Sequence, residues 1–322
     1  MDLNNLPSVS IVIIGRNEAG NLPACIRSIR EMNYPREKLE ILYVDTDSND
    51  GSPEIAKSLG VMVYEEHSNF PSPGRARNRG WREAKYAIVH FVDGDMTVAS
   101  EYLRQAVLYL GEDGIACVIG GLQERYATRR LITRIVEYPW KVKVPGLISA
   151  PGAGGTFLKS VLAEVGGYNP DLARSEETDL GERLHEKGYQ VLMIETIMGI
   201  HDYGINNPGA LWEFYQNRGR SFARISRFPL KKSISADKRA SRHNQIECGL
   251  TLLVLLGVCI SRLWWLLLIL IALLIFYVII RYWQPGRLRG LRIAYFLLDY
   301  FFKPAVWVGM AQYYLGQVLG KN

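Results

Sequence analysis

The chain has 322 residues, of which 48% are hydrophobic, and a formal net charge of +6. This length fits one large domain or two smaller ones. Its four cysteines are too scattered for a zinc site or a disulfide framework, which excludes those classes and fits reduced thiols in a cytosolic setting. The first apolar run, residues 9–14, is too short for a signal peptide and no basic segment precedes it, so we expect no export signal there.

Short apolar runs rich in β-branched residues alternate with segments of helical spacing. Such runs are typical of strands that are buried on both faces of a sheet. The predicted strands are residues 9–14, 40–45, 61–64, 87–93, 115–120 and 190–194. The predicted helices are residues 21–32, 53–59, 75–85, 99–110 and 175–187. This alternation predicts an α/β fold with a doubly wound, mostly parallel sheet.

Carboxylates follow two of these strands. Asp45 closes one strand, and Asp93 and Asp95 close another with Gly94 between them. Because the carboxyl ends of parallel strands share one edge of a sheet, these acids can converge on one crevice. Two acids there, with a glycine that lets the backbone approach a ligand, indicate a divalent cation that holds a phosphate. The alternative is an ordinary strand-end turn, since Asp and Gly are both turn residues.

A second group of candidate residues lies near the end of the predicted sheet. Glu176, Glu177 and Asp179 fall in the first turn of a predicted helix that has Ser175 as its N-cap. Acids in a first turn favour the helix dipole, or one of them faces the crevice as the general base for an attacking hydroxyl. His201 follows a strand, and it either completes a metal shell or is a structural histidine.

Two further segments have open interpretations. The small residues of segment 151–158 either let a substrate approach closely or form a plain glycine-rich loop. Residues 129–148 mix basic and apolar side chains. They form either a helix on a membrane surface or an amphipathic helix packed on the sheet.

The C-terminal third is basic and then apolar. Nine basic residues and one acid lie between Arg218 and Arg242, and an apolar run of 32 residues, 249–280, follows. One helix of that length would span about 48 Å at about 1.5 Å per residue, whereas the hydrocarbon core of a bilayer is about 30 Å thick. Arg262 would also fall near its middle, where a charge is costly. A hairpin that turns at Arg262 removes both difficulties, and the basic residues at its two ends predict that both are cytoplasmic; a buried soluble helix pair is the alternative.

Six short motifs follow one another in the first 200 residues. They are a strand with Asn17-Glu18 after it, an Asp-rich turn at residues 45–52, Ala76-Arg77-Asn78, Asp93-Gly94-Asp95, a small-residue segment followed by Gly166-Gly167-Tyr168, and the acid pair Glu176-Glu177 before an apolar helix. In this order they resemble the inverting glycosyltransferases of family 2, which have the GT-A fold. The resemblance covers about residues 8–200.

The resemblance implies roles for these residues. Asp45 would contact the base of a nucleotide, Asp93 the ribose or the metal, and Asp95 an Mn²⁺ or Mg²⁺ ion on the diphosphate. Glu177 stands where the family usually carries an aspartate base, and Glu176 and Asp179 are the other candidates for that base. The remaining candidates are Asn17, Glu18, Asp47, Arg77 and Asn78 for donor binding, Gly154, Gly155 and Thr156 for acceptor binding, and His201 as a further metal ligand.

One family motif is incomplete. Processive synthases of the family carry Gln-x-x-Arg-Trp, whereas this chain has Gln216, Arg218 and Arg220 with no tryptophan. This difference favours a single-addition enzyme. Arg218 and Arg220 would then contact the diphosphate of the donor, or lipid headgroups instead.

The resemblance and the apolar C-terminal third together predict the domain order. The expected parts are a GT-A catalytic domain at 1–217 (nucleotide-sugar part about 1–98, acceptor part about 99–217), a basic juxtamembrane segment at 218–245, a transmembrane hairpin at 246–281, and an interfacial or membrane helix with the tail at 282–322. Whether residues 291–319 cross the membrane stays open.

We therefore expect a glycosyltransferase anchored in the inner or plasma membrane, with its catalytic domain in the cytoplasm. It would move a sugar from a nucleotide-sugar, with UDP-sugars favoured, to a lipid-linked or glycan acceptor, and it would not bind nucleic acid. A polyprenyl-phosphate glycosyltransferase, whose ionised acceptor needs no base, is the first alternative. A non-catalytic nucleotide-binding scaffold at the membrane is the second. Dinucleotide, P-loop and nucleotidyltransferase sites lack their glycine-rich motifs here.

Overall fold

The computed structural model describes residues 5–68, 72–124, 145–152, 154–172, 175–201, 207–225 and 303–318. The chain divides into two compact units. The first, which we call the sheet unit, comprises Met1–Arg125 and Trp140–Tyr203; the second, the helical unit, comprises Tyr126–Pro139 and Gly204–Asn322. The predicted boundary at residue 217 falls inside a helix of the helical unit, α8 (Pro208–Ile225).

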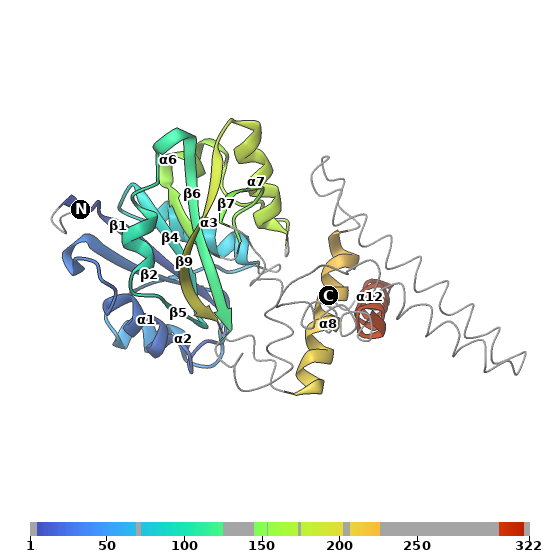
Figure 1. Ribbon diagram of the computed structural model, residues 1–322. Helices are drawn as coiled ribbons and strands as arrows, with labels where there is room; N and C mark the ends of the chain where they lie inside the picture. The colour runs from blue at the N-terminus through green and yellow to red at the C-terminus, as the bar shows by residue number, and fades with distance from the viewer. Residues whose placement is uncertain are drawn as a thin grey trace, which may run out of the picture. The chain divides into compact units, whose positions relative to one another are not determined.

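The sheet unit contains one nine-stranded mixed sheet (Figure 1). Its strands in spatial order are β3 (Met62–Glu65), β2 (Leu39–Asp45), β1 (Val9–Gly15), β4 (Ile88–Asp93), β8 (Gly155–Leu158), β6 (Ile115–Glu124), β9 (Gln190–His201) and β5 (Met96–Val98), and β7 (Gly146–Ile148) pairs with β9. The first four run parallel to one another, as the sequence predicts. Beyond β4 the pairing changes: β8 is antiparallel to both of its neighbours, and β5 and β7 are antiparallel to β9.

The expectation of a mostly parallel sheet is therefore correct only for the half that begins the chain. The parallel half is built from βα repeats, in which a crossover that contains a helix brings the chain back to start the next strand in the same direction. The other half is built from strands far apart in sequence, and only β6 and β9 are parallel there. We refer to the two halves as the parallel half (β3, β2, β1, β4) and the mixed half (β8, β6, β9, β5, β7).

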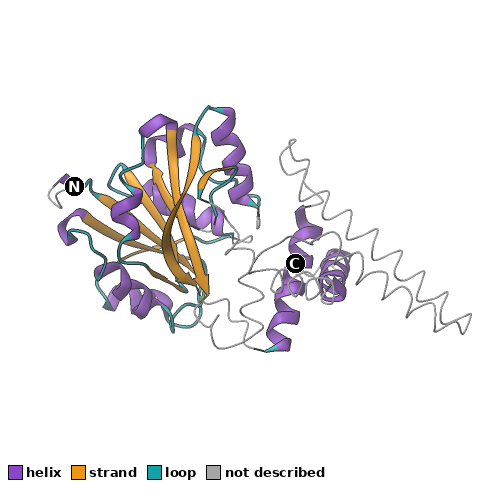
Figure 2. Ribbon diagram, in the orientation of Figure 1, coloured by secondary structure: helices purple, strands orange, loops and turns teal. Residues whose placement is uncertain are grey.

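Helices cover both faces of the sheet (Figure 2). One face carries α1 (Leu22–Arg30), α2 (Ser52–Ser58) and α4 (Tyr102–Ala106), and the other carries α3 (Pro73–Glu83), α6 (Lys159–Glu164) and α7 (Glu176–Glu186). The alternation of strand side chains produces this arrangement, because successive residues of a strand face opposite sides. In β1, Ile11 and Ile13 enter one core, whereas Val12 and Ile14 enter the other.

Three predicted elements differ from the structure. The helix expected over residues 99–110 is shorter, and only Tyr102–Ala106 is α-helical. The helix expected over 129–148 is wrong at its end, where Gly146–Ile148 is strand β7; residues 129–144 lie outside the described part of the chain. Segment 151–158, for which a plain glycine-rich loop is one of two interpretations, contains strand β8, because Thr156 and Phe157 pair with both neighbouring strands.

The described part of the helical unit is a pair of packed helices, α8 and α12 (Lys303–Val318). The two cross closely at two glycines: a Cβ atom on Gly219 would overlap the carbonyl of Val306, and one on Gly309 would overlap the carbonyl of Gln216. Among the described residues, no helix has both the length and the apolar character needed to span a bilayer. The predicted hairpin at 246–281 lies outside the described residues.

Candidate active site

A pocket of about 440 Å³ opens at the edge of the sheet where the parallel strands end. Its walls come from the ends of β1, β2 and β4 and from the first turns of α3 and α7. Five carboxylates line it against two guanidinium groups. The acids are Glu18, Asp93, Asp95, Glu176 and Glu177, and the basic residues are Arg16 and Arg77. With every group ionised the lining would carry an excess of three negative charges, and with Glu176 protonated an excess of two, so the pocket favours cations in either case.

Gly94 lets two strand ends approach each other in this pocket. Its backbone N–H donates to the carbonyl of Ile14, with N and O 2.8 Å apart. A Cβ atom at position 94 would lie 3.0 Å from Cγ of Glu18 and 3.3 Å from the carbonyl oxygen of Ile14. The turn after β4 therefore has little room for a side chain at this position, and it holds Asp93 and Asp95 against the end of β1.

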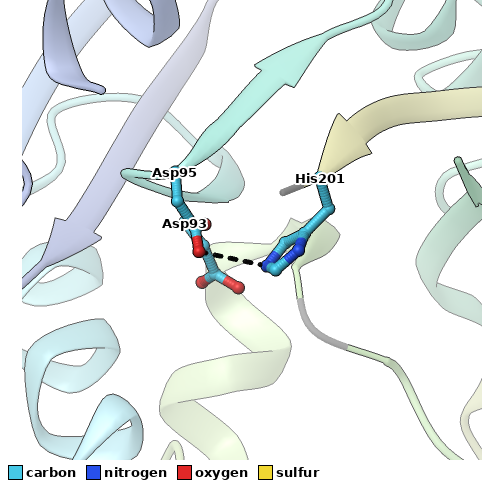
Figure 3. A group of neighbouring side chains, drawn as sticks. All are labelled: Asp93, Asp95 and His201. Carbon is cyan, nitrogen blue, oxygen red and sulfur yellow. Dashed lines mark ion pairs between the residues drawn. The ribbon is translucent and has the colours of Figure 1, made fainter. Parts of the chain in front are cut away.

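Asp93, Asp95 and His201 form a group that can hold a metal ion (Figure 3). One ligand atom from each of the three lies within 4.8 Å of the other two, and Nε2 of His201 is 3.3 Å from Oδ2 of Asp95. The antiparallel pairing of β5 with β9 produces this contact, because it places His201 opposite Met96. Two carboxylates and an imidazole suit a divalent ion such as Mn²⁺, with positions left for phosphate oxygens.

Arg77 joins the acids of β4 to those of α7. Its side chain is only 2% exposed. Nη2 lies 3.1 Å from Oδ1 of Asp93, whereas Nη1 lies 3.1 Å from Oε1 of Glu176 and 3.4 Å from Oε1 of Glu177. The guanidinium carbon also lies 5.4 Å from the centre of the Tyr168 ring. The charge of Arg77 is thus shared among three carboxylates that belong to two different elements.

The three candidate bases on α7 have different surroundings. Glu176 is nearly buried, with 4% of its side chain exposed. Its burial, and to a smaller extent the negative charge of Glu177, raises the pKa of Glu176. Glu177 is 22% exposed and lines the pocket. Asp179 forms an ion pair with Arg183, 2.7 Å away, and is not among the pocket-lining residues. Of the three, Glu177 is the carboxylate that combines access to the pocket with exposure.

The start of α7 differs from the prediction in one detail. Ser175 stands at the N-cap position, but its backbone is left-handed (φ 63°) and its side chain makes no capping hydrogen bond to the helix. The first turn of α7 instead has Glu176 against Arg77. The ion pair between Arg77 of α3 and Glu176 therefore fixes this end of the helix, a role that the sequence assigns to a serine cap.

The Asn-Glu turn and the Asp-rich turn are fastened to each other. The N–H of Asn17 donates to the Ser48 hydroxyl over 2.8 Å, and the N–H of Asn49 donates to Oδ1 of Asn17 over 2.9 Å. The N–H of Glu18 donates to the Ser52 hydroxyl over 2.8 Å. Asn17 therefore has a structural use in this turn, whereas the side chain of Glu18 lines the pocket. Burial, together with the nearby Asp95 and Asp93, raises the pKa of Glu18 against the opposing effect of its Asn21 hydrogen bond.

The two predicted donor-binding residues of the Asp-rich turn, Asp45 and Asp47, lie outside the pocket lining. Asp45 is buried, and its carboxylate accepts from the Tyr43 hydroxyl (2.8 Å) and from the N–H of Ser48 (2.9 Å). Asp47 is exposed and lies 2.7 Å from Nδ1 of His67, which lowers the pKa of Asp47 and raises that of His67. Thr46, between them, is the residue of this turn that lines the pocket.

Asn78 is a buried residue that holds the Gly-Gly-Tyr turn. Its Nδ2 donates to the Tyr168 carbonyl over 2.7 Å, and its Oδ1 accepts from the Tyr168 N–H over 2.8 Å and from the Trp81 indole over 3.0 Å. These contacts occupy its amide. Asn78 thus supports the site from behind, away from the pocket lining.

The predicted acceptor residues lie in or beside strand β8. Thr156 is fully buried, and its hydroxyl lies 3.1 Å from Nδ1 of His90 and 3.2 Å from the Tyr102 hydroxyl. Its side chain is therefore not available to an acceptor in this structure. Gly154 and Gly155 both have positive φ angles, and a Cβ atom on Gly154 would lie 3.0 Å from the Phe91 carbonyl. These glycines allow close packing of β8 on β4.

Arg16 and Ser72 line the pocket and were not predicted. Arg16 directly precedes Asn17, and Ser72 caps α3 by accepting from the N–H of Arg75, a capping pattern that the sequence does display.

Arg218 and Arg220 belong to the helical unit. The Arg220 guanidinium donates to the Gln312 side chain over 2.8 Å, and the side chain of Arg218 lies outside the described part of the chain.

Comparisons with known proteins match part of the chain to one family of domains. Residues 10–153 match the sequence profile of Glycosyl transferase family 2. Glycosyltransferase AglE of Haloferax volcanii is 26% identical over 209 residues, 62% of this chain and 68% of the relative. The beta-monoglucosyldiacylglycerol synthase of Trichormus variabilis is 23% identical over 65% of this chain and 47% of its own length. The chain thus spans about half the length of some curated relatives.

A solved structure agrees with the fold. The mannosyltransferase PcManGT of Pyrobaculum calidifontis, solved in complex with GDP-Man and Mn²⁺, superimposes with a TM-score of 0.56 at 16% identity. The match covers 99% of this chain and 88% of that protein. At this identity the likeness concerns the fold, which is of the GT-A type with its curled mixed sheet.

Proposed function

Since the chain carries a family 2 glycosyltransferase domain, we propose that it transfers a sugar from a nucleotide-sugar to an acceptor hydroxyl, with a divalent cation and with inversion. The observation that carries this proposal is the acidic pocket at the strand ends, with Asp93, Asp95 and His201 grouped in it. The donor favoured is a UDP-sugar, and a GDP-sugar is the second candidate.

The charge of the pocket argues for a cation. A nucleoside diphosphate is an anion, and a pocket lined by five acids would repel it. Arg77 does not reverse this repulsion, since its guanidinium is already shared by three carboxylates. A divalent ion held by Asp93, Asp95 and His201 would neutralise the charge that develops on the diphosphate as the glycosidic bond breaks. The two carboxylates and the imidazole of this group are ligands that suit such an ion.

Glu177 is the proposed general base. The acceptor oxygen forms a bond to the anomeric carbon of the sugar, and its proton passes to the Glu177 carboxylate. The bond from the anomeric carbon to the diphosphate breaks, and its electron pair leaves with the nucleoside diphosphate. Glu177 suits this step because it lines the pocket and is partly exposed. Glu176 is buried with a raised pKa, and Asp179 is occupied by Arg183.

We propose that the acceptor is lipid-linked and that the enzyme works at the cytoplasmic face of the inner or plasma membrane. The sequence supports this through the basic segment 218–245 and the apolar segment 246–281. The name of one relative, a glucosyldiacylglycerol synthase, is consistent with a lipid acceptor. Fractionation of cells that express the full chain tests the location: recovery in the membrane pellet is expected, and recovery in the soluble fraction contradicts it.

The activity is tested by donor hydrolysis with detergent-purified protein. A panel of UDP-, GDP- and dTDP-sugars is incubated with and without Mn²⁺, with wild type beside Asp95→Ala. We expect one nucleotide to be released in a metal-dependent way, and we expect the variant to lose this release. If no donor is bound or turned over in any condition, the proposed function is wrong.

The nature of the acceptor is tested by Glu177→Gln, with Asp179→Asn as the matched control on the same helix. A hydroxyl acceptor needs a base, so transfer by the Gln variant should fall sharply while the control keeps its rate. A phosphate acceptor is already ionised. Near-normal transfer by Glu177→Gln would therefore favour a polyprenyl-phosphate glycosyltransferase.

A further inference from the structure

We propose that Arg77 is a positioning residue that holds Glu177 in place by bracing it against Asp93 and Glu176, and that it does not itself bind the donor. The inference rests on the proposed function, and it replaces the donor-binding role that the sequence pattern implies for this arginine. It is built on three features of the described residues: the burial of the guanidinium, its three carboxylate partners, and the way in which α3 is fixed on the sheet.

The guanidinium is enclosed, and both of its terminal nitrogens face carboxylates. The side chain is 2% exposed, so little of it reaches the solvent-filled part of the pocket. Nη1 faces Glu176 and Glu177, and Nη2 faces Asp93. The planar fork of arginine matches such an arrangement, since it can donate in two fixed directions at once. A donor phosphate would have to displace a carboxylate to reach either nitrogen.

The helix that carries Arg77 is fixed in position. Gly80 packs directly on β1, where a Cβ atom would overlap the side chain of Val12. Asn78 is bonded to both the N–H and the carbonyl of Tyr168, and the Tyr168 ring lies beside the Arg77 guanidinium. Buried arginines of this kind lose little freedom on forming their hydrogen bonds, because their surroundings already hold them. The guanidinium is therefore a fixed point between two elements.

Arg77 joins the element that carries a proposed metal ligand to the element that carries the proposed base. Asp93 ends β4 and belongs to the metal group, whereas Glu177 lies in the first turn of α7 and is the proposed base. Through its ion pairs with both residues, Arg77 links the Glu177 carboxylate to Asp93. Small errors in the position of a reacting group reduce rates strongly, on the order of 10²-fold for about 1 Å.

The test is Arg77→Lys, which keeps the charge and loses the fork, beside Arg79→Lys as the matched control. Arg79 lies on the same helix, is 43% exposed and pairs with Glu83. For Arg77→Lys we expect kcat to fall on the order of 10²-fold. The dissociation constant of the nucleoside diphosphate with Mn²⁺, measured by calorimetry, should stay within about three-fold of wild type because the donor contacts remain. Arg79→Lys should change neither quantity. An unchanged kcat with weaker nucleotide binding would mean that Arg77 is a donor ligand, and the inference would be overturned.

A double-variant cycle separates positioning from a general structural effect. If Arg77 acts through Glu177, then Arg77→Lys should change kcat by less than about two-fold in a Glu177→Gln background, because that base is already absent. A further loss as large as in the wild-type background would contradict the proposal. If Arg77→Lys does not fold, as judged by circular dichroism, the same cycle is run with Arg77→Gln combined with Glu176→Gln, which removes one buried acid together with the cation. Failure of wild type to bind any nucleotide would instead overturn the proposed function, and this inference with it.

Discussion

The parallel half and the mixed half of the sheet contribute different parts of the candidate site. The parallel half supplies Glu18, Asp93 and Asp95 from turns that directly follow β1 and β4. The mixed half supplies His201, which reaches the site only because β9 pairs with β5. Local sequence therefore places the first group, whereas long-range pairing places the second. Acids at strand ends can therefore be predicted from sequence, whereas the partners brought to them across the sheet are much harder to predict.

The largest effect is expected for a substitution of Glu177. This residue belongs to α7, a helix that packs on the mixed half and borders the pocket of the parallel half. Glu177→Gln keeps the size of the side chain and removes its basicity. Loss of a general base costs about 10²- to 10⁴-fold, so we expect kcat for sugar transfer to fall about 10³-fold. Transfer assays with radiolabelled donor measure this fall. Asp179→Asn, which alters an acid paired with Arg183 away from the pocket lining, should stay within about two-fold of wild type, since a partly exposed ion pair contributes little.

Gly80 tests how tightly the parallel half is packed. A Cβ atom there would overlap Val12 of β1 and lie 3.2 Å from Val44 of β2. Overpacking of this kind costs about 1–3 kcal/mol, so we expect Gly80→Ala to lower the free energy of unfolding by about 3 kcal/mol. Urea denaturation measures the change. Gly20→Ala is the control, because a Cβ atom at position 20 has no neighbour within 4 Å; equal losses in both variants would contradict the packing argument.

His90 tests the junction between the two halves. It lies in β4, and its Nδ1 is 3.2 Å from the Gly155 carbonyl and 3.1 Å from the Thr156 hydroxyl in β8. Burial lowers the pKa of His90 from 6.5 to about 4, so the folded protein keeps it neutral where the unfolded chain would protonate it. The stability that His90 contributes is thus present above about pH 6.5 and is lost as the pH falls toward 4.

From pH 7 to pH 5 the loss due to this one group is about 2 kcal/mol. Denaturation curves at the two pH values measure it. Glutamine does not titrate, so the free energy of unfolding of His90→Gln should change less between the two pH values, by this amount. The variant should also be less stable overall. An identical pH dependence in both proteins would mean that His90 is not held neutral at this junction.

The smallest of these effects concerns the contribution of the mixed half to metal binding. His201→Ala removes one of three candidate ligands and leaves Asp93 and Asp95 in place. We expect the affinity for Mn²⁺ to fall about ten-fold, about 1.4 kcal/mol, as measured by electron paramagnetic resonance of the free ion. His185→Ala, an exposed histidine on α7, is the control. If His201→Ala binds Mn²⁺ as wild type does, then the histidine is structural, which is the other interpretation that the sequence allowed.

The sequence predicts most of the parallel half, because each strand there is a single apolar run and its neighbours are set by short βα connections. The Asp-Gly-Asp turn and the acid pair on α7 follow from the same local patterns. The mixed half is harder to predict. Strand β8 begins at one glycine with a positive φ angle and directly follows another, and β7 has only three residues, so neither shows a clear alternation.

The functions of single polar residues were less predictable than the site itself. Arg77 and Asn78 have the sequence pattern of donor-binding residues, yet both are buried and bonded to protein groups. Thr156 stands in a run of small residues, yet its hydroxyl faces His90. In each case the side chain is directed by a strand or turn distant in sequence, and no local pattern records that partner. Arg16 and Ser72 were missed for the same reason, since only the packing of the turns shows that they line the pocket.

The acidic pocket is expected to bind a nucleoside diphosphate by way of a divalent cation. Calorimetric titration of the full chain in detergent with UDP and with GDP, in Mn²⁺ and again in EDTA, tests this claim most directly. Binding of one nucleotide in Mn²⁺, weakened at least about 100-fold in EDTA, is the result that the charge of the pocket predicts. Equally tight binding in EDTA would contradict the account, because the five acids of the pocket would then have to accept the diphosphate without a cation.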